Sequence, residues 1–483
     1  MYLQIDKIKV LISSICFSSV MSSCTKFVQI EPPTTSITGS TVYSNNTSAA
    51  AAVTSIYNNM MATQGLSGGI NSISYLDGLE ADELKNYTND NLTLIQFYTN
   101  SLTSSSNGGS NNYFWQELYQ EIYVTNAVME GLNNSTTLSD SIKQQLYGEA
   151  EFMRAFFNFY AVNLYGDVPL VTTTNYQVNN TIKRTPSTQI YQQIISDLKD
   201  AQNKLNSSFV DYQGLSTPER IRPNKGAATA LLARAYLYQQ KWDSAMAQAT
   251  LLINNPQYSI VNLTNVFLAN SNETIWQLQP VAPGYNTYDA QYFVLTSAPG
   301  TGTNYVALGA NLLNSFEPND QRFINWVGTF IDPSSNDTFY FPYKYKVYLN
   351  PKPVTEYLMV LRLGEQYLIR AEAEANGAGN GIADAISDLN VIRTRSSLPP
   401  YSGATDQASV QTAIMHERQI ELFTEWGHRW FDLKRTRSID SVMGPPGYVC
   451  RDKGGTWSPN WELMPLPLNE LEVNPNLKQN LGY

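Results

Sequence analysis

The clearest pattern along the chain is a series of apolar residues spaced three and four positions apart. One series runs from Ser139 and Asp140, which suit the start of a helix, to Gly166, which suits its end. Its apolar positions are Ile142, Leu146, Ala150, Met153, Phe157 and Ala161. Because this spacing places side chains on one helix face, it predicts an amphipathic helix between Ser139 and Gly166.

The same spacing recurs further along the chain and predicts helices in pairs. A second helix begins at Ser187, and further helices are predicted over 224–236, from 241, over 361–375, over 382–395 and over about 409–431. Leu232, Ala233, Tyr236, Trp242 and Ala245 follow the tetratricopeptide spacing, in which small residues let two helices approach and aromatic residues fill the gaps. We therefore expect Tyr236 and Trp242 to be largely buried, in helix pairs over about 139–255 and 358–435. Helical hairpins without repeat ancestry are the alternative.

Two long segments, 62–115 and 257–350, have a different pattern. They are rich in Asn, Gly, Thr, Tyr and Pro and have little helical periodicity. Their many aromatic residues argue against disorder, and residues 274–278 and 338–341 are predicted to be short strands. The expected fold is therefore mainly α, with a tetratricopeptide-like scaffold of helix pairs, a large loop-rich lobe and minor short strands.

The N-terminal residues have the pattern of an export signal. Residues 10–20 are apolar, too short a stretch to cross a bilayer but the right length for a signal peptide. Small residues then lead to Cys24, as in a bacterial lipobox with Met21 in place of the usual Leu. We expect residues 1–23 to be a lipoprotein signal peptide, Cys24 to be lipidated, 24–40 to be an extended tether and 41–483 to be a single domain. An ordinary secretory signal is the alternative.

Composition narrows the chemistry that the chain can carry out. A formal charge of −10 disfavours binding to nucleic acid, and two histidines exclude a three-histidine zinc site. His416 and Glu417 begin a zinc motif, but Ile420 stands at the second ligand position, so no metal site is expected. Cys450, in a predicted loop, is a passive cysteine rather than a catalytic thiol. The 31 tyrosines and many uncharged polar residues favour a surface for neutral ligands.

Several sequence blocks carry a family resemblance in a fixed order. They are residues 148–157 (GEAEFMRAFF), 164–170 (LYGDVPL), 222–228 (RPNKGAA), 362–373 (RLGEQYLIRAEA), 389–395 (LNVIRTR), 417–422 (ERQIEL), 427–435 (GHRWFDLKR) and 474–480 (NPNLKQN). Together they resemble the SusD/RagB outer-membrane lipoproteins over nearly the whole chain. The chain departs from the family pattern at Glu151, where a basic residue is commoner.

The resemblance implies a function without catalysis or a cofactor. Such proteins are lipid-anchored in the outer membrane, at the cell surface, where their helix pairs pack against a SusC-like TonB-dependent transporter. Their loop-rich side captures a nutrient, usually a glycan, for import. A surface glycoside hydrolase, which needs two carboxylic acids, and a peptide-binding member of the same family are the alternatives. The sequence does not identify the glycan.

The expected ligand-binding residues are aromatic side chains of the two loop segments, because flat rings stack on sugar faces. Trp326 is the first choice since it has the largest ring, and Asp320 or Asn325 would supply hydrogen bonds. The other candidates are Tyr75, Tyr87, Tyr98, Tyr285, Tyr288 and Tyr292. Each ring could instead anchor its loop in the core.

Overall fold

The computed structural model describes residues 39–62, 66–67, 69–104, 112–300, 302 and 304–483. Cys24, the predicted signal peptide and most of the predicted tether lie outside the described residues. The short helix α2 (Gly39–Val42) belongs to a unit separate from the compact unit Tyr43–Tyr483. All that follows concerns the unit Tyr43–Tyr483.

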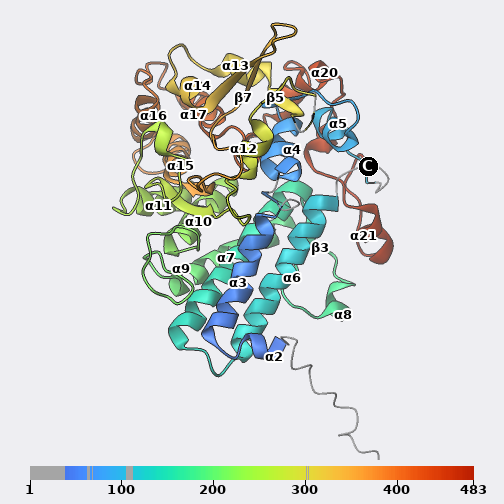
Figure 1. Cartoon of the computed structure of the whole chain (residues 1–483), viewed down its shortest axis with the longest axis vertical. Coiled ribbons are helices and arrows are strands. Elements are labelled where there is room, and N and C mark those ends of the chain that lie inside the picture. The colour runs from blue at the N-terminus through green and yellow to red at the C-terminus, as the bar shows by residue number, and fades with distance from the viewer. Residues whose placement is uncertain (1–38, 63–65, 68, 105–111, 301, 303) are drawn as a thin grey trace, which may run out of the picture. The chain divides into compact units, whose positions relative to one another are not determined.

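The scaffold consists of helices that pack on one another in chain order (Figure 1). They are α6 (Asn112–Asn134), α7 (Asp140–Tyr165), α9 (Ser187–Lys204), α10 (Lys225–Tyr238), α11 (Trp242–Ile253), α15 (Leu363–Ala375), α16 (Ile382–Arg395) and α17 (Gln407–Leu422). An additional helix, α3 (Asn46–Met60), packs against α6 and α7. Successive helices that contact mainly their neighbours are typical of tetratricopeptide-like arrays. The prediction of a mainly helical, paired scaffold is confirmed.

The ends of these helices follow from their capping residues. Ser139 precedes α7, and Gly166 ends it with a φ of 74°, a conformation that glycine adopts without strain. Asn224 caps α10 by accepting a hydrogen bond from the backbone N–H of Ala227. Tyr236 is buried as expected, but Trp242 is only half-buried at the start of α11. The expectation of a largely buried Trp242 was therefore wrong, because only part of the indole packs against the core.

Two helical predictions needed correction. The sequence periodicity gave no helix at 112–134, where the structure has α6. The helix predicted over 409–431 is two helices, since α17 ends at Leu422 and α18 spans His428–Arg435. Between them, Thr424, Trp426 and Gly427 have φ angles of 52°, 46° and 70°, which a continuous helix does not allow. The turn directs the Trp426 indole N–H to the Met359 carbonyl oxygen, 2.7 Å away.

The described residues form four two-stranded antiparallel sheets. They are β1 (Leu84–Asn86) with β5 (Val306–Leu308), β2 (Val168–Pro169) with β3 (Arg184–Thr185), β4 (Thr274–Leu278) with β8 (Leu358–Arg362), and β6 (Val327–Ile331) with β7 (Thr338–Pro342). The strands predicted at 274–278 and 338–341 are confirmed. Because β8 occupies residues 358–362, α15 starts at Leu363 rather than at the predicted 361.

The remaining segments contain more short helices than the sequence indicated. Within the two predicted loop segments, which we call the loop lobe, lie α4 (Ile73–Glu80), α5 (Leu92–Tyr98), α12 (Tyr288–Phe293), α13 (Ala310–Ser315), α14 (Gln321–Trp326), and the 3-10 turns η2 (Gly69–Asn71) and η3 (Leu263–Asn265). Elsewhere lie α8 (Tyr176–Asn179), α19 (Ile439–Met443), α20 (Val449–Asp452), η4 (Pro459–Glu462) and α21 (Leu468–Val473). In the part of the chain that the structure describes, no helix combines the length and apolarity needed to cross a membrane.

Cys450 lies in the short helix α20 rather than in the predicted loop. Its side chain is buried, and its Sγ donates a hydrogen bond to the Thr456 carbonyl oxygen at 2.7 Å. Burial raises the pKa of the thiol above its ordinary value. A buried thiol with a raised pKa is a poor nucleophile, which agrees with a passive cysteine.

Candidate functional site

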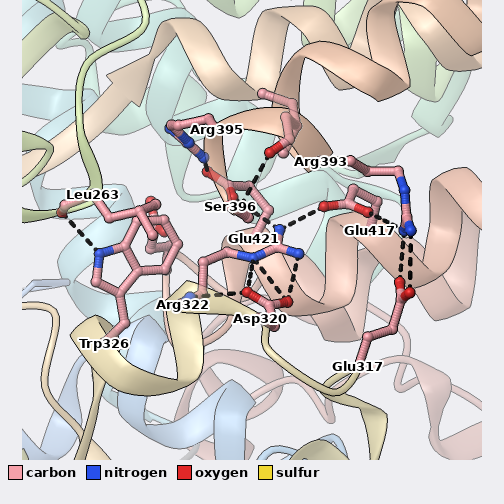
Figure 2. A network of polar contacts seen from close by, with 12 residues as sticks. Leu263, Glu317, Asp320, Arg322, Trp326, Arg393, Arg395, Ser396, Glu417 and Glu421 are labelled. Carbon is pink, nitrogen blue, oxygen red and sulfur yellow. Dashed lines mark hydrogen bonds and ion pairs between the residues drawn. The ribbon is translucent and has the colours of Figure 1, made fainter. Parts of the chain in front are cut away.

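A buried network of charged side chains joins the helix scaffold to the loop lobe, and Figure 2 shows part of it. Its members, which we call the charge network, are Glu273, Asp320, Arg322, Lys344, Arg362, Arg393, Arg395, Glu417, Glu421 and Glu425. Arg322 bridges two elements, with Nη2 2.8 Å from Asp320 Oδ2 and Nη1 2.6 Å from Glu417 Oε1. Arg362 Nη1 lies 2.5 Å from Glu421 Oε1. Buried charges need such partners to offset their lost hydration.

Within the charge network, Glu421 shows how strongly the paired charges act on one another. Burial alone would raise the pKa of Glu421, but Arg395, Arg362 and Arg322 hold this pKa well below its ordinary value. A carboxylate that stays ionised against three guanidinium groups cannot act as a proton donor near neutral pH. The ion pairs of Glu421 therefore join α14, β8 and α16 to α17.

Trp326 lies inside the charge network, and its predicted role as a stacking platform was wrong. The side chain is 0% exposed, and its indole N–H donates to the Leu263 carbonyl oxygen at 3.0 Å (Figure 2). Lys344 Nζ lies 4.9 Å from the ring centroid, and the guanidinium carbons of Arg395 and Arg362 lie at 5.6 and 6.0 Å. The ring therefore contacts cations of the core and presents no face to a sugar.

Two predicted partners of Trp326 are also used locally. Asp320 is buried, caps α14 by accepting from the backbone N–H of Arg322, and forms an ion pair with the Arg322 guanidinium. Asn325 donates its side-chain N–H to the Gln321 carbonyl oxygen at 2.8 Å within α14. The expectation that either residue binds a ligand beside Trp326 was wrong, because the Trp326 ring is buried and has no exposed face for a ligand.

Tyr75 is likewise a core residue rather than a binding residue. Its ring is 1% exposed and stacks on Phe293, with centroids 5.2 Å apart and ring planes 10° apart. Burial raises the pKa of Tyr75 well above its ordinary value, and the hydroxyls of Tyr305 and Tyr292 add to the rise. Tyr75 therefore packs in the core against Phe293, the last residue of α12. Tyr305, a half-buried neighbour, was not among the predicted candidates, and no periodic signal distinguished it.

Tyr285, Tyr288 and Tyr292 form what we call the tyrosine surface. Tyr285 is 40% exposed, and Tyr288 and Tyr292 are partly exposed. Tyr288 and Tyr292 stand one turn apart on α12, with ring centroids 6.4 Å apart and planes at 40°. Burial raises the pKa of Tyr288, and the nearby hydroxyls of Tyr292 and Tyr285 raise it further. Tyr288 and Tyr292 therefore lie close together, Tyr285 lies three residues before α12, and all three rings retain solvent-accessible area.

The backbone around the tyrosine surface is held by specific contacts. Thr287 caps α12 by accepting from the backbone N–H of Ala290. The buried Asn286 side chain donates to the Pro353 carbonyl oxygen and accepts from the backbone N–H of Glu356. Gly69 packs beneath Tyr292, where an added Cβ would lie 2.8 Å from Tyr292 Cε2. These contacts hold the backbone at the start of α12 in place and pack the Tyr292 ring against Gly69.

Tyr87 and Tyr98 remain half-buried and make contacts elsewhere in the loop lobe. Tyr87 meets Phe339 edge-on at 5.6 Å, and Lys85 Nζ lies 4.8 Å from the Tyr87 ring. Lys453 Nζ lies 5.5 Å from the centroid of Tyr98. Both rings therefore have partners within the protein, and the tyrosine surface is the better candidate site.

The one acidic residue of α12 lies beneath the tyrosine surface rather than on it. The acidic residue of α12, Asp289, is buried, and burial with the nearby Glu425 raises its pKa to about 7, against an opposite effect of Lys344. Its carboxyl group therefore faces the core rather than the three rings. Across the described ranges, no group of three or more histidine, cysteine or acidic side chains could hold a metal ion.

Comparisons with known proteins agree with this architecture. SusD-like protein P25 of Formosa agariphila is 25% identical, over 95% of this chain and 97% of the relative. The structure of a SusD superfamily protein from Bacteroides vulgatus ATCC 8482 has a TM-score of 0.79 and 22% identity, covering 91% of this chain and 99% of that one. Surface glycan-binding protein A from Bacteroides thetaiotaomicron in complex with laminarihexaose has a TM-score of 0.74 and 18% identity, covering 90% and 99%.

These solved structures share the fold, and the family is shown by a separate match. The model of the SusD family matches residues 81–483, which is most of the chain. That range contains the sequence blocks that carried the resemblance, and it includes both the charge network and the tyrosine surface. The chain therefore belongs to the SusD family.

Proposed function

We propose that this protein is a non-catalytic, cell-surface glycan-binding lipoprotein. It captures an oligosaccharide or polysaccharide at the tyrosine surface and delivers it to a SusC-like TonB-dependent transporter in the outer membrane. The observation that carries the proposal is the group of partly exposed rings of Tyr285, Tyr288 and Tyr292 on α12 and shortly before it. Such rings stack on the apolar faces of sugars, and their hydroxyls offer hydrogen bonds.

Two further observations support a neutral ligand. The described side chains of α12 bring no exposed charge to the tyrosine surface, because Asp289 is buried. A structural neighbour with the same fold was solved with laminarihexaose, a neutral oligosaccharide. The ligand class therefore fits both the composition and the geometry of the site.

Binding of glycan is tested with the mature protein and a panel of laminarin, xylan, mannan and galactan in affinity gels. We expect retention by at least one polysaccharide without release of reducing ends. The double variant Y285A/Y288A should weaken that retention about tenfold or more, because two of the three stacking rings are lost. Release of reducing ends by the wild type would favour a glycoside hydrolase instead.

The membrane anchor is tested separately. Cys24→Ala should release the protein into a soluble fraction, because the thioether-linked lipid would supply the membrane affinity. The matched control is Cys16→Ala, which changes a cysteine of the predicted signal peptide and should leave the mature protein in the outer membrane. Membrane retention of Cys24→Ala, with no acyl mass on residue 24, would contradict the anchor.

Transfer to a transporter requires a stable contact with a SusC-like barrel. Co-purification of the native lipoprotein from outer membranes tests this part of the proposal. We expect a TonB-dependent receptor to co-elute in equal amounts and to remain bound after Y285A/Y288A, since the tyrosine surface is proposed to face the glycan. Loss of the receptor in that variant would mean that the three rings contact the transporter.

A further inference from the structure

A second concave site lies beside α6, outside the loop lobe. It is a groove of about 510 Å³ lined by residues of α6, α8 and α21 and by residues near β2 and β3. Figure 1 shows α8 and α21 along the same side of α6. This volume is within the range of small-molecule sites in proteins. None of the predicted site residues and no member of the charge network lines this groove.

One wall of the groove is a row of aromatic side chains on α6. Trp115, Tyr119 and Tyr123 are four residues apart, so they lie on one helix face. Trp115 is buried at the base and lies 4.7 Å from Tyr119 between ring centroids, while Tyr123 is 48% exposed. The Tyr119 hydroxyl donates to the Pro169 carbonyl oxygen at 2.9 Å, which fixes the middle ring. The row therefore forms an apolar surface that is buried at Trp115 and exposed at Tyr123, with the Tyr119 ring held in place between them.

Amide groups also line the groove. Asn179 donates its side-chain N–H to the Thr173 carbonyl oxygen at 2.8 Å, which fixes the orientation of the amide. Its Oδ1 is buried and accepts no hydrogen bond from the residues that the structure describes. Asn180 adds an exposed amide at the same wall. A buried acceptor without a partner costs stability, and a hydroxyl of a ligand would satisfy it.

The groove also has little charge. Among the described residues that line it, Glu470 is the one acidic group, and burial raises its pKa, against a smaller opposite effect of the hydrogen bond from Trp115. Aromatic faces, amide acceptors and low charge suit a neutral molecule with many hydroxyl groups. A ligand with several charges would find Glu470 as its one charged partner among the described lining residues.

We propose that this α6 groove is an accessory glycan-binding site, which takes a second segment of the polysaccharide captured at the tyrosine surface. This inference takes the class of ligand, a glycan, from the proposed function. The place of binding is inferred from the lining of the groove. Two sites on one long chain raise the apparent affinity by effective concentration, whereas a short oligosaccharide reaches only one of them.

The test compares wild type with two groove variants, Tyr123→Ala and Asn179→Ala, using whichever polysaccharide of the four-member panel binds. We expect each variant to bind the polysaccharide about five- to tenfold more weakly than wild type. Tyr123→Phe should bind like wild type, because the ring is kept. Tyr212→Ala is the matched control, since Tyr212 is 46% exposed and does not line the groove. Circular dichroism and the unfolding midpoint check that all variants fold.

The outcomes separate the groove from the tyrosine surface. Groove variants that bind like wild type would overturn the accessory site and leave the proposed function intact; a groove that serves only a protein contact would give this result. Weak binding in the groove variants together with wild-type binding in Y285A/Y288A would support the groove and overturn the tyrosine surface. A wild type that binds no polysaccharide of the panel would overturn both.

Discussion

The charge network and the tyrosine surface use aromatic side chains from the same loop segment in opposite ways. Trp326 is fully buried and has Lys344, Arg362 and Arg395 around its ring, whereas Tyr285 keeps 40% of its surface exposed. Both residues stand in a stretch without helical periodicity. The size of a ring and its place in a loop therefore do not determine whether it binds a ligand. Trp326 is buried by contacts with distant elements, among them Phe267, Lys344 and Arg395.

The two regions also differ in what holds them. The charge network depends on paired charges from β8, α14, α16 and α17, so the loss of one member leaves others unpaired. The tyrosine surface depends on caps and on backbone contacts of Asn286 and Gly69, so a single ring can be removed without disturbing its support. Substitutions should therefore affect stability in the first region and ligand affinity in the second.

The largest effect is expected for Arg362→Ala. Arg362 pairs with Glu273, Glu421 and Glu425, and its removal would leave buried carboxylates without a counter-charge. Breaking a buried pair in this way typically costs about 3–5 kcal/mol of unfolding free energy, measured by urea denaturation. The control is Arg451→Ala, whose pair with Asp452 is exposed and should contribute less than about 1 kcal/mol. Equal effects of the two variants would contradict a structural role for the charge network.

Trp326→Ala should destabilise the protein by a similar amount, about 3–5 kcal/mol, through lost contacts and a cavity. Glycan affinity of the folded variant, measured by calorimetry, should stay within about twofold of wild type, because no face of the ring is exposed. A large loss of affinity without a loss of stability would mean that Trp326 binds the ligand. It would contradict the difference between the charge network and the tyrosine surface.

An intermediate effect is expected from a buried carboxylic acid at the edge of the loop lobe. Burial raises the pKa of Glu83 to about 8, and the nearby Asp82 carboxylate contributes a smaller part of the rise. The hydrogen bond from the Thr424 backbone N–H and the nearby cations Arg429 and Lys344 lower this pKa, but by less than burial raises it. The unfolded state loses this proton near pH 4.5 and the folded state near pH 8, so rising pH favours unfolding across this window. Glu83→Gln should therefore reduce the loss of stability between pH 5 and pH 8, by about 1–3 kcal/mol.

The measurement for Glu83→Gln is urea denaturation of both proteins at pH 5 and at pH 8. Glu219→Gln is the control, because Glu219 is only half-buried and its Oε2 accepts a hydrogen bond from the Asn270 side chain at 2.9 Å. The Glu219 variant should keep the pH dependence of the wild type. An unchanged pH dependence in Glu83→Gln would mean that the Glu83 carboxyl group is ionised in the folded protein at neutral pH.

The sequence predicted the scaffold far better than the site, for physical reasons. A helix such as α7 can be predicted from its own residues. The spacing of its apolar residues, Ser139 before it and Gly166 at its end all act locally along the chain. The break between α17 and α18 could not be predicted, since it depends on Trp426 reaching the Met359 carbonyl oxygen, 67 positions away. Trp326 likewise contacts Arg362 and Arg395, which stand far along the chain from it. Of the aromatic candidates, Tyr288 and Tyr292 lie on α12, and Tyr285 lies three residues before its start.

The smallest effect is expected for a single ring of the tyrosine surface. Tyr285→Ala removes a ring that is already 40% exposed, so its loss should weaken glycan binding about two- to fivefold, equivalent to about 0.4–1 kcal/mol. Unfolding free energy should change by less than about 0.5 kcal/mol, because the substitution is at the surface. Tyr285→Phe keeps the stacking face but removes the hydroxyl, so it distinguishes the contribution of the ring from that of the hydroxyl. If the Phe variant binds like wild type and the Ala variant does not, stacking carries the interaction; if both lose affinity equally, the hydroxyl does. Isothermal titration with the retained oligosaccharide distinguishes these results, and a Tyr285→Ala variant that loses stability but keeps affinity would make Tyr285 another anchoring ring, like Trp326.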